Sequence, residues 1–143
     1  MTVQVVARWA TAVAALVLIA IVVAADRQTL PLLLQRVYTY PAGDKLGHVG
    51  LYGGLAFLAA LGFTQRTRPV AGVRVPVSTL VIVVLATLEE GSQAWFPGRT
   101  ASVWDLLASY VGIAGGTIAA NRARDVYRRA RAARWLATGE GVD

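Results

Sequence analysis

Long apolar stretches separated by short charged segments dominate the chain. Four stretches contain no Asp, Glu, Lys or Arg, at 9–25, 46–65, 75–88 and 106–121. A membrane-spanning helix needs about 20 residues. The third stretch reaches that length only by including Glu89 and Glu90, and the fourth by including Asp105, each near one end. The pattern predicts four membrane-spanning helices, with bounds at 9–25, 47–63, 75–95 and 102–120.

The composition also indicates a membrane protein. Of the 143 residues, 56% are hydrophobic and 15% are charged, whereas about 25% of the residues in a soluble domain are charged. We therefore predict an all-α membrane protein, a bundle of four transmembrane helices within 1–120 followed by a basic cytoplasmic tail at 121–143. The chain has no cysteine, which excludes a disulfide scaffold, a thiolate zinc site and a cysteine nucleophile. No motif indicates a cofactor, and none is predicted.

The basic residues indicate the side of the membrane on which each end lies, because cytoplasmic loops carry an excess of Lys and Arg. Ten basic residues fall in the N-terminal segment, the second connection and the tail, and four fall in the segments opposite. The prediction is a multi-pass protein with its N- and C-termini in the cytoplasm.

The first apolar stretch has a second interpretation. Arg8, the apolar core and the small residues Val23, Ala24 and Ala25 also resemble a secretory signal peptide with its cleavage site. Cleavage would leave three spanning helices with an external N-terminus. The stretch is longer than most signal-peptide cores, which favours a retained helix.

Pairs of glycines four residues apart occur in two of the predicted helices. Gly50 and Gly54 lie in the second, and Gly112 and Gly116 lie in the fourth. Small residues at this interval let two helix backbones approach closely in a membrane, so we predict that these glycines form a helix–helix contact. The alternative is that glycine is simply common in membrane helices.

With this orientation, the polar residues that interrupt the apolar stretches all lie at the outer end of the bundle. They come from three helices and one loop: Asp44, Lys45, His48, Tyr52, Glu89, Glu90, Gln93, Arg99, Asp105 and Ser109. An ionisable residue within a span costs about 2.5–3.5 kcal/mol on insertion scales, so it needs a partner or water. Because the cytoplasmic helix ends have no matching carboxylates, we interpret the ten residues as one polar site. The alternative is that each charge merely extends into the headgroup region.

Two finer predictions concern single residues of this site. His48 has no second ligand at a spacing familiar from metal sites, so no metal is predicted. Glu90 and Arg99 are predicted to act as one unit, because a guanidinium can hold a carboxylate through two hydrogen bonds. Pro97 and Gly98 suit the turn that brings Arg99 back toward the membrane.

Three segments resemble motifs of the VanZ-like family, in the order in which that family carries them. Residues 44–52 (DKLGHVGLY) resemble its DKxxHxxxY motif, and residues 89–99 (EEGSQAWFPGR) resemble its [DE]ExxQ…PGR motif. Residues 105–112 (DLLASYVG) resemble its DxxxNxxG motif, and the whole match covers 44–116, about half of the chain. The departure is Ser109, where the family usually has asparagine. Serine keeps a donor and an acceptor but loses the reach of the amide.

The resemblance implies a small multi-pass protein of the bacterial cell membrane, in a family named for teicoplanin resistance. We expect its outward polar site to engage an envelope lipid or a peptidoglycan precursor and to lower glycopeptide susceptibility, with no catalytic residue assigned. Two alternatives stay open. One is a structural or interaction protein, and the other is an enzyme that acts on an amphiphilic, phosphate-bearing substrate through His48, Lys45 and Arg99. An open hydrated cavity would favour binding or chemistry, and a closed salt-bridged cluster would favour scaffolding.

The segment 121–137 contains six arginines with apolar residues between them. Most of these apolar residues fit one helical stripe, which predicts a cytoplasmic helix lying on anionic lipid. Each basic residue near such a surface contributes about 1 kcal/mol. The alternative is a solvated basic tail. Nucleic acid is not predicted as a partner, and the pattern does not indicate an oligomeric state.

Overall fold

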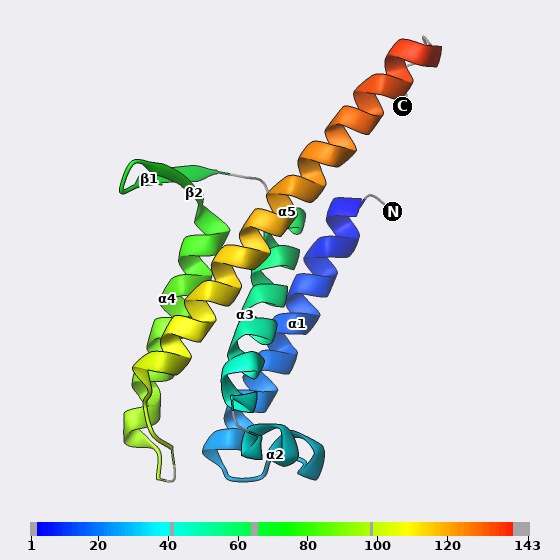
Figure 1. Ribbon diagram of the computed structural model, residues 1–143. Helices are drawn as coiled ribbons and strands as arrows, with labels where there is room; N and C mark the ends of the chain where they lie inside the picture. The colour runs from blue at the N-terminus through cyan, green and yellow to red at the C-terminus, as the bar shows by residue number, and fades with distance from the viewer. Residues whose placement is uncertain (1–2, 41, 64–65, 98, 139–143) are drawn as a thin grey trace.

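The computed structural model describes residues 3–40, 42–63, 66–97 and 99–138. The chain is mostly helical. Its long helices run between the same two ends of the molecule and are inclined to one another (Figure 1). The elements, in chain order, are α1 (Val3–Asp26), α2 (Leu32–Thr39), α3 (Gly43–Gly62), β1 (Thr67–Val70), β2 (Val73–Pro76), α4 (Val77–Ser92), the 3-10 turn η1 (Gln93–Trp95) and α5 (Val103–Thr138). Gly98, which belongs to the predicted turn before Arg99, and residues 139–143 of the predicted tail lie outside the described residues.

Within the described residues, three helices are long and apolar enough to cross a membrane: Val3–Asp26, Val77–Trp95 and Val103–Ala137. Their outward faces carry large exposed apolar side chains, such as Leu16 on α1, Val84 on α4 and Val111 on α5. An apolar surface of this kind suits contact with lipid. The chain is therefore a membrane protein.

Helix α3 corresponds to the second predicted span but is not among these three helices. Its first two turns carry Asp44, Lys45 and His48, which lower its apolar character. It is nevertheless the central helix, because it packs against α1, α2, α4 and α5. One hydrophobic cluster joins α3 to its neighbours. It contains Tyr52, Leu55 and Ala56 of α3, Ile82 of α4 and Ile113 of α5.

The closest helix contact lies between α3 and α5, where backbone meets backbone. A Cβ added to Gly112 would press on the Val49 backbone of α3, and one added to Gly116 would press on that of Gly53. A Cβ added to Gly53 would lie 3.0 Å from the carbonyl oxygen of Gly112. These positions must therefore stay without a side chain for the two helices to approach as they do.

The prediction for the other glycine pair is wrong. A Cβ added to Gly50 or Gly54 would have no neighbour within 4 Å, and both residues are exposed. The face of α3 that meets α5 instead contains Val49 and Gly53. Each of these residues directly precedes one of the two predicted glycines. A shift of one residue turns a helical position by about 100°, which is enough to leave the contact.

Two features of the other end of the bundle differ from the predicted loop and surface helix. The first is an antiparallel hairpin, β1–β2, which pairs Val70 with Val73 and Arg68 with Val75. Its two central residues, Ala71 and Gly72, have φ angles of 46° and 80°. Two successive left-handed residues give the type of tight turn that matches the twist of paired strands.

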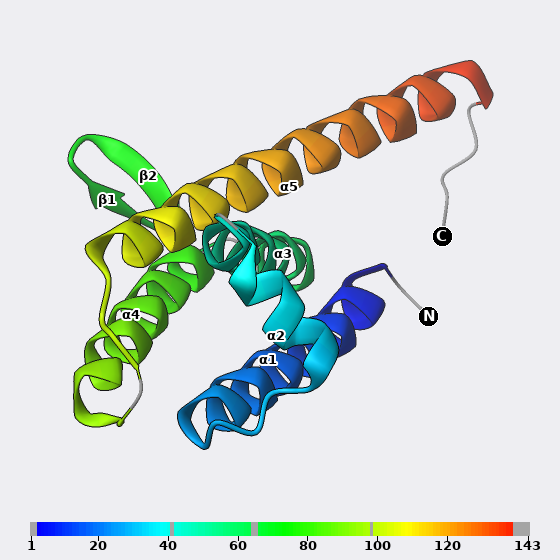
Figure 2. The same cartoon turned by 60° about the horizontal axis from the view of Figure 1, so that its bottom comes forward.

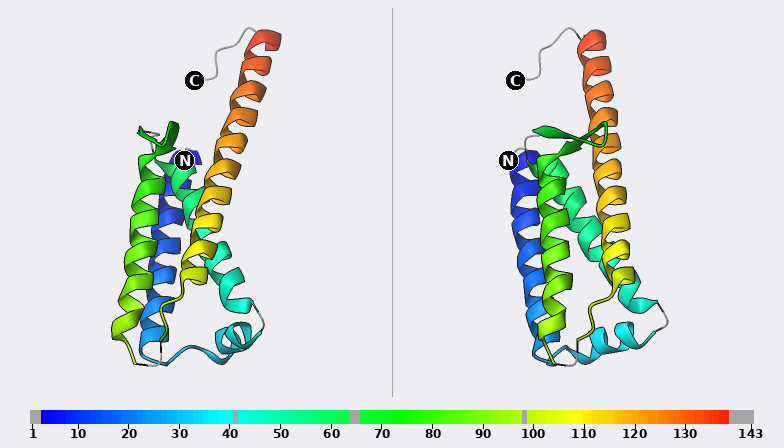
Figure 3. Two further views of the ribbon diagram at one scale, coloured as in Figure 1. Left: turned by 60° about the vertical axis from the view of Figure 1, so that its left-hand side comes forward. Right: turned by 90° about the vertical axis from the view of Figure 1, so that its left-hand side faces the viewer.

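The second feature is the continuity of α5. It runs for 36 residues without interruption, about 54 Å at the usual helical rise, and it extends well past the start of α1 (Figure 3). The predicted C-terminal helix is therefore not a separate element but the continuation of α5, because no Gly or Pro interrupts the segment 117–138. Arg124 also holds α5 in line by donating hydrogen bonds to the carbonyl oxygens of Leu61 and Phe63, each at 3.1 Å, at the end of α3.

Candidate functional site

The ten predicted site residues converge at one end of the bundle. They lie on the first turns of α3, on the last turn of α4 and η1, in the following loop, and on the first turns of α5. This is the end that carries α2, opposite the hairpin (Figure 1). Hydrogen bonds, ion pairs and one ring contact connect all ten into a single network.

At the outer edge, Lys45 joins α3 to α5. Its Nζ lies 3.0 Å from Asp44 Oδ2 and 3.1 Å from Asp105 Oδ1. Asp44 and Lys45 precede the apolar part of α3. The hydrogen bond from the ammonium lowers the pKa of the Asp44 carboxyl, and the hydrogen bonds to Asp44 and then Asp105 raise the pKa of Lys45. The charge of Lys45 is therefore already balanced by two carboxylates.

Deeper in the site, Arg99 joins α4 to α1. Its guanidinium lies 3.3 Å from Glu89 Oε1 and 3.4 Å from Asp26 Oδ1, and its Nε donates to Gln93 Oε1 at 3.4 Å. The side chains of Arg99, Glu89 and Asp26 are 19%, 14% and 13% exposed. The Asp26 oxygen is fully enclosed and has no conventional hydrogen bond within the described structure, so Arg99 provides its compensation.

The predicted pairing of Glu90 with Arg99 is therefore wrong. Glu90 is almost completely buried, and it accepts hydrogen bonds from the Ser102 N–H at 2.6 Å and from Gln93 Nε2 at 3.3 Å. Consecutive helical residues point about 100° apart, so only one of Glu89 and Glu90 can face the arginine. Glu90 has no ion pair among the residues that the structure describes.

The hydrogen bonds around His48 define the state of its imidazole. Ser109 Oγ donates to the carbonyl oxygen of Asp105 at 3.0 Å and lies 3.0 Å from His48 Nδ1. Because Ser109 donates its one hydroxyl proton to the Asp105 carbonyl oxygen, its oxygen accepts a hydrogen bond from the Nδ1–H of His48. In the neutral imidazole this places the free lone pair on Nε2. Ser109 thus positions the imidazole of His48 through its hydroxyl group.

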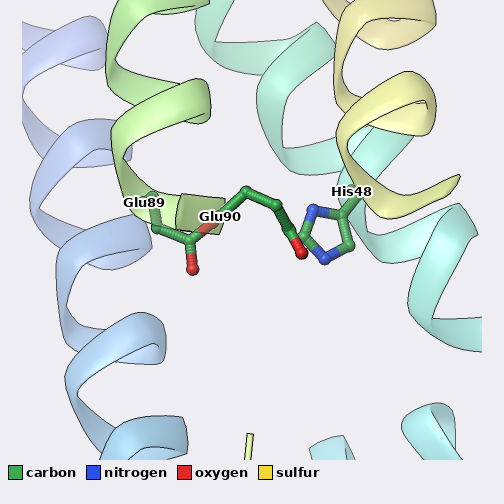
Figure 4. Close-up of side chains that lie close together, drawn as sticks. All are labelled: His48, Glu89 and Glu90. Atoms are coloured by element: carbon green, nitrogen blue, oxygen red, sulfur yellow. The ribbon is translucent and has the colours of Figure 1, made fainter. Parts of the chain in front are cut away.

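Tyr52 connects His48 to the carboxylates. Its ring stacks on the imidazole with 6.2 Å between centroids, and its hydroxyl donates to Glu89 Oε2 at 3.3 Å. The other Glu89 oxygen accepts from Gln93 Nε2 at 2.9 Å. His48, Glu89 and Glu90 consequently lie together at the centre of the network, and Figure 4 shows Glu90 extending from α4 toward the imidazole on α3.

The site contains more negative than positive charge. Five carboxylates take part, from Asp26, Asp44, Glu89, Glu90 and Asp105, against the two cations Lys45 and Arg99. Both cations are already paired. The arrangement therefore does not favour the idea that Lys45 and Arg99 hold a phosphate directly, because a dianion would enter among unbalanced carboxylates.

An open cavity of about 560 Å³ lies beside the network. It is lined by Ala25, Gln28, Leu30, Gln35, Asp44, His48, Gln93, Arg99, Thr100 and Asp105. Helix α2 crosses this end of the bundle, as Figure 2 shows, and the segment before and within it supplies Leu30 and Gln35 to the lining. The volume lies within the range of about 300–1,000 Å³ that is common for small-molecule sites.

Two contributors to the site are missing from the prediction. Asp26 ends the first apolar stretch, and a carboxylate at the end of a predicted span is a signal that could have found it. The Ser102 N–H is a backbone donor at the start of a helix, where the first N–H groups lack helical partners. The sequence shows neither the partner of Asp26 nor the contact of Ser102.

No protein-family model matches the chain, and no curated protein or solved structure matches it. Support for a function therefore comes from the geometry of this site and from the three sequence motifs.

Proposed function

We propose that the chain is a VanZ-like integral membrane protein of the bacterial cell envelope. In this proposal its polar site faces outward, engages an envelope lipid or a peptidoglycan precursor, and lowers susceptibility to teicoplanin. Binding is the proposed activity, and no residue is assigned a catalytic role.

The observation that carries the proposal is the open cavity of about 560 Å³ beside the polar network. A closed set of ion pairs would serve to hold the helices together, but a cavity of this size is large enough for the head of an amphiphile. Its wall combines apolar side chains such as Leu30 with polar ones such as Gln28 and Gln93. A molecule with an apolar tail and a polar head is suited to such a site at the membrane surface.

The proposed topology has four spans, with α3 as the fourth membrane-crossing helix and both termini in the cytoplasm. The excess of arginines at the hairpin end supports this orientation. Contacts of α1 favour a retained first helix over a cleaved signal peptide. Arg8 Nε donates to the carbonyl oxygen of Gly62 at 2.8 Å, and Asp26 pairs with Arg99 at the other end.

Anionic lipid is the proposed partner of the basic end. A second cavity, of about 540 Å³, is lined there by Val3, Gln4, Leu61, Phe63, Ala123, Arg124, Tyr127, Arg128 and Arg131. Apolar and basic side chains together suit the border between acyl chains and phosphate headgroups. In this proposal the first part of the tail, which lines this cavity, contacts lipid. The rest of α5 extends past the other helices into the cytoplasm.

A cavity-filling variant tests the proposed function. Thr100 is exposed and lines the cavity, and Thr100→Trp adds a bulky indole there without removing an ion pair. We expect wild-type protein taken from bacterial membranes to retain an amphiphile that native mass spectrometry detects. Thr100→Trp should retain at least about tenfold less, which corresponds to about 1.4 kcal/mol of binding free energy. It should also lose the protection against teicoplanin that the wild-type protein gives.

Ala101→Trp is the matched control, because Ala101 is an exposed neighbour that does not line the cavity. It should behave as the wild-type protein in both measurements, with equal folded protein in the membrane. Equal capture and equal protection by Thr100→Trp and Ala101→Trp would contradict the proposal and favour a scaffolding role.

A further inference from the structure

Three potential metal ligands meet between α3 and the end of α4. His48, Glu89 and Glu90 each offer one donor atom, and these atoms lie within 4.8 Å of one another (Figure 4). Ligands around a tetrahedral zinc ion at about 2.1 Å are about 3.4 Å apart. The three donors can therefore reach one ion through small side-chain rotations. The sequence does not show this set, because His48 precedes Glu89 by a long interval that includes the hairpin.

The imidazole presents the nitrogen that a metal requires. Since Nδ1–H is donated to Ser109 Oγ, Nε2 carries the free lone pair. A metal-bound histidine almost always donates its other ring N–H to a fixed acceptor in this way. Here the acceptor is itself fixed by its hydrogen bond to the backbone of α5.

The carboxylates are also held by outer contacts. Tyr52 and Gln93 donate to Glu89, and Gln93 and the Ser102 N–H donate to Glu90. Such contacts orient ligating side chains. The excess of carboxylates over cations in the site gives an independent reason to expect a cation, because a divalent ion would reduce the mutual repulsion of Glu89 and Glu90.

We propose that His48 Nε2, one oxygen of Glu89 and one oxygen of Glu90 bind a single divalent transition-metal ion. One imidazole and two carboxylates suit Zn²⁺, Mn²⁺ or Fe²⁺ better than Mg²⁺ or Ca²⁺, which prefer all-oxygen ligands. Three protein ligands leave at least one coordination position open. We place that open position on the side of the open cavity, because His48 lines the cavity.

This inference deepens the proposed function, and its last step rests on it. A phosphate group of the envelope amphiphile would bind the open position of the ion. The ion would thus provide the positive charge that the paired Lys45 and Arg99 do not offer. The metal site itself does not depend on the identity of the amphiphile.

Zn²⁺ alone is the probe for the test. Wild-type protein is purified through an affinity tag that contains no histidine. It is then stripped of metal and equilibrated with Zn²⁺ in detergent without lipid. We expect one saturable Zn²⁺ per chain, lost in His48→Gln and Glu90→Gln. Ser109→Ala should bind about 10–100-fold more weakly, because it removes the acceptor of Nδ1–H. The control Asp125→Asn removes a carboxylate on the exposed part of α5 and should bind as the wild-type protein does.

A second measurement needs no variant, so it remains decisive if a variant fails to fold. His48 is the only histidine in the chain, and protein labelled with ¹⁵N-histidine therefore gives one pair of ring signals. We expect Zn²⁺ to shift the Nε2 signal most, because Nε2 is the ring nitrogen left with a lone pair when Nδ1–H is donated to Ser109 Oγ.

Absence of saturable Zn²⁺ binding would overturn the metal site, as would Zn²⁺ binding that leaves the ring signals unchanged. Because no lipid is present, this failure is separate from failure of the proposed function. Capture of an amphiphile by protein without Zn²⁺ binding would leave the proposed function in place, and Zn²⁺ binding without capture would leave only the metal site.

Discussion

Replacing Arg99 with glutamine should destabilise the protein by about 3–5 kcal/mol, because the change leaves two enclosed carboxylates without their cation. Asp26 and Glu89 are both at least 85% buried at the side chain, and Arg99 lies 3.4 and 3.3 Å from them. Thermal unfolding in detergent, followed by circular dichroism, measures the effect. Arg27→Gln is the matched control, because Arg27 is exposed at the end of α1 and its replacement should leave the unfolding temperature unchanged.

A double variant identifies the partner of the arginine. In the Arg99→Gln background, Asp26→Asn should recover part of the lost stability, because it removes one of the two unbalanced charges. Glu90→Gln should not recover stability through this ion pair, because Glu90 accepts its hydrogen bonds from Ser102 and Gln93. Rescue by Glu90→Gln together with no rescue by Asp26→Asn would show that the arginine pairs with Glu90 after all.

The second large effect is expected at the contact of α3 with α5. Gly116→Ala adds a methyl group against the backbone of Gly53, which cannot move aside as a flexible side chain could. Overpacking of this kind costs about 1–3 kcal/mol, and the same unfolding measurement should show it as a lower unfolding temperature.

Gly115→Ala is the matched control on the same helix, because a Cβ there would have no neighbour within 4 Å. Alanine is a better helix former than glycine by about 0.5–1 kcal/mol, so this variant should be as stable as the wild-type protein or slightly more stable. Equal unfolding temperatures for the two variants would show that the two helices do not meet at Gly116.

The spacing of charges in the sequence is enough to predict the long helices and the convergence of the polar residues. A helix inserted in a membrane must begin and end near its charged residues, and the ends of antiparallel neighbours meet at the same surface. The phase of packing was harder to predict. Gly50 and Gly54 have the same spacing as Gly112 and Gly116, but a spacing does not say which face of a helix meets its partner.

The choice of partners inside the site also depends on three-dimensional packing. Glu89 and Glu90 have the same chemistry, and only the rotation of α4 determines that Glu89 meets Arg99 and Glu90 meets Ser102. Asp26 counted in the sequence only as a charge that ends a stretch, because its partner lies far along the chain. Proximity of His48 to Glu89 and Glu90 requires α3 and α4 to pack side by side, which no local pattern encodes.

Thiol labelling of intact cells determines whether the polar site opens to the outside of the cell, as we propose. The chain has no cysteine, so single cysteines can be introduced at exposed positions at each end. Thr100 lines the cavity, and Val73 lies in the hairpin at the opposite end. In intact cells a membrane-impermeant thiol reagent should label Thr100→Cys and leave Val73→Cys unlabelled until the cells are opened. Labelling of Val73→Cys with protection of Thr100→Cys would overturn the proposed orientation, because the site would then face the cytoplasm.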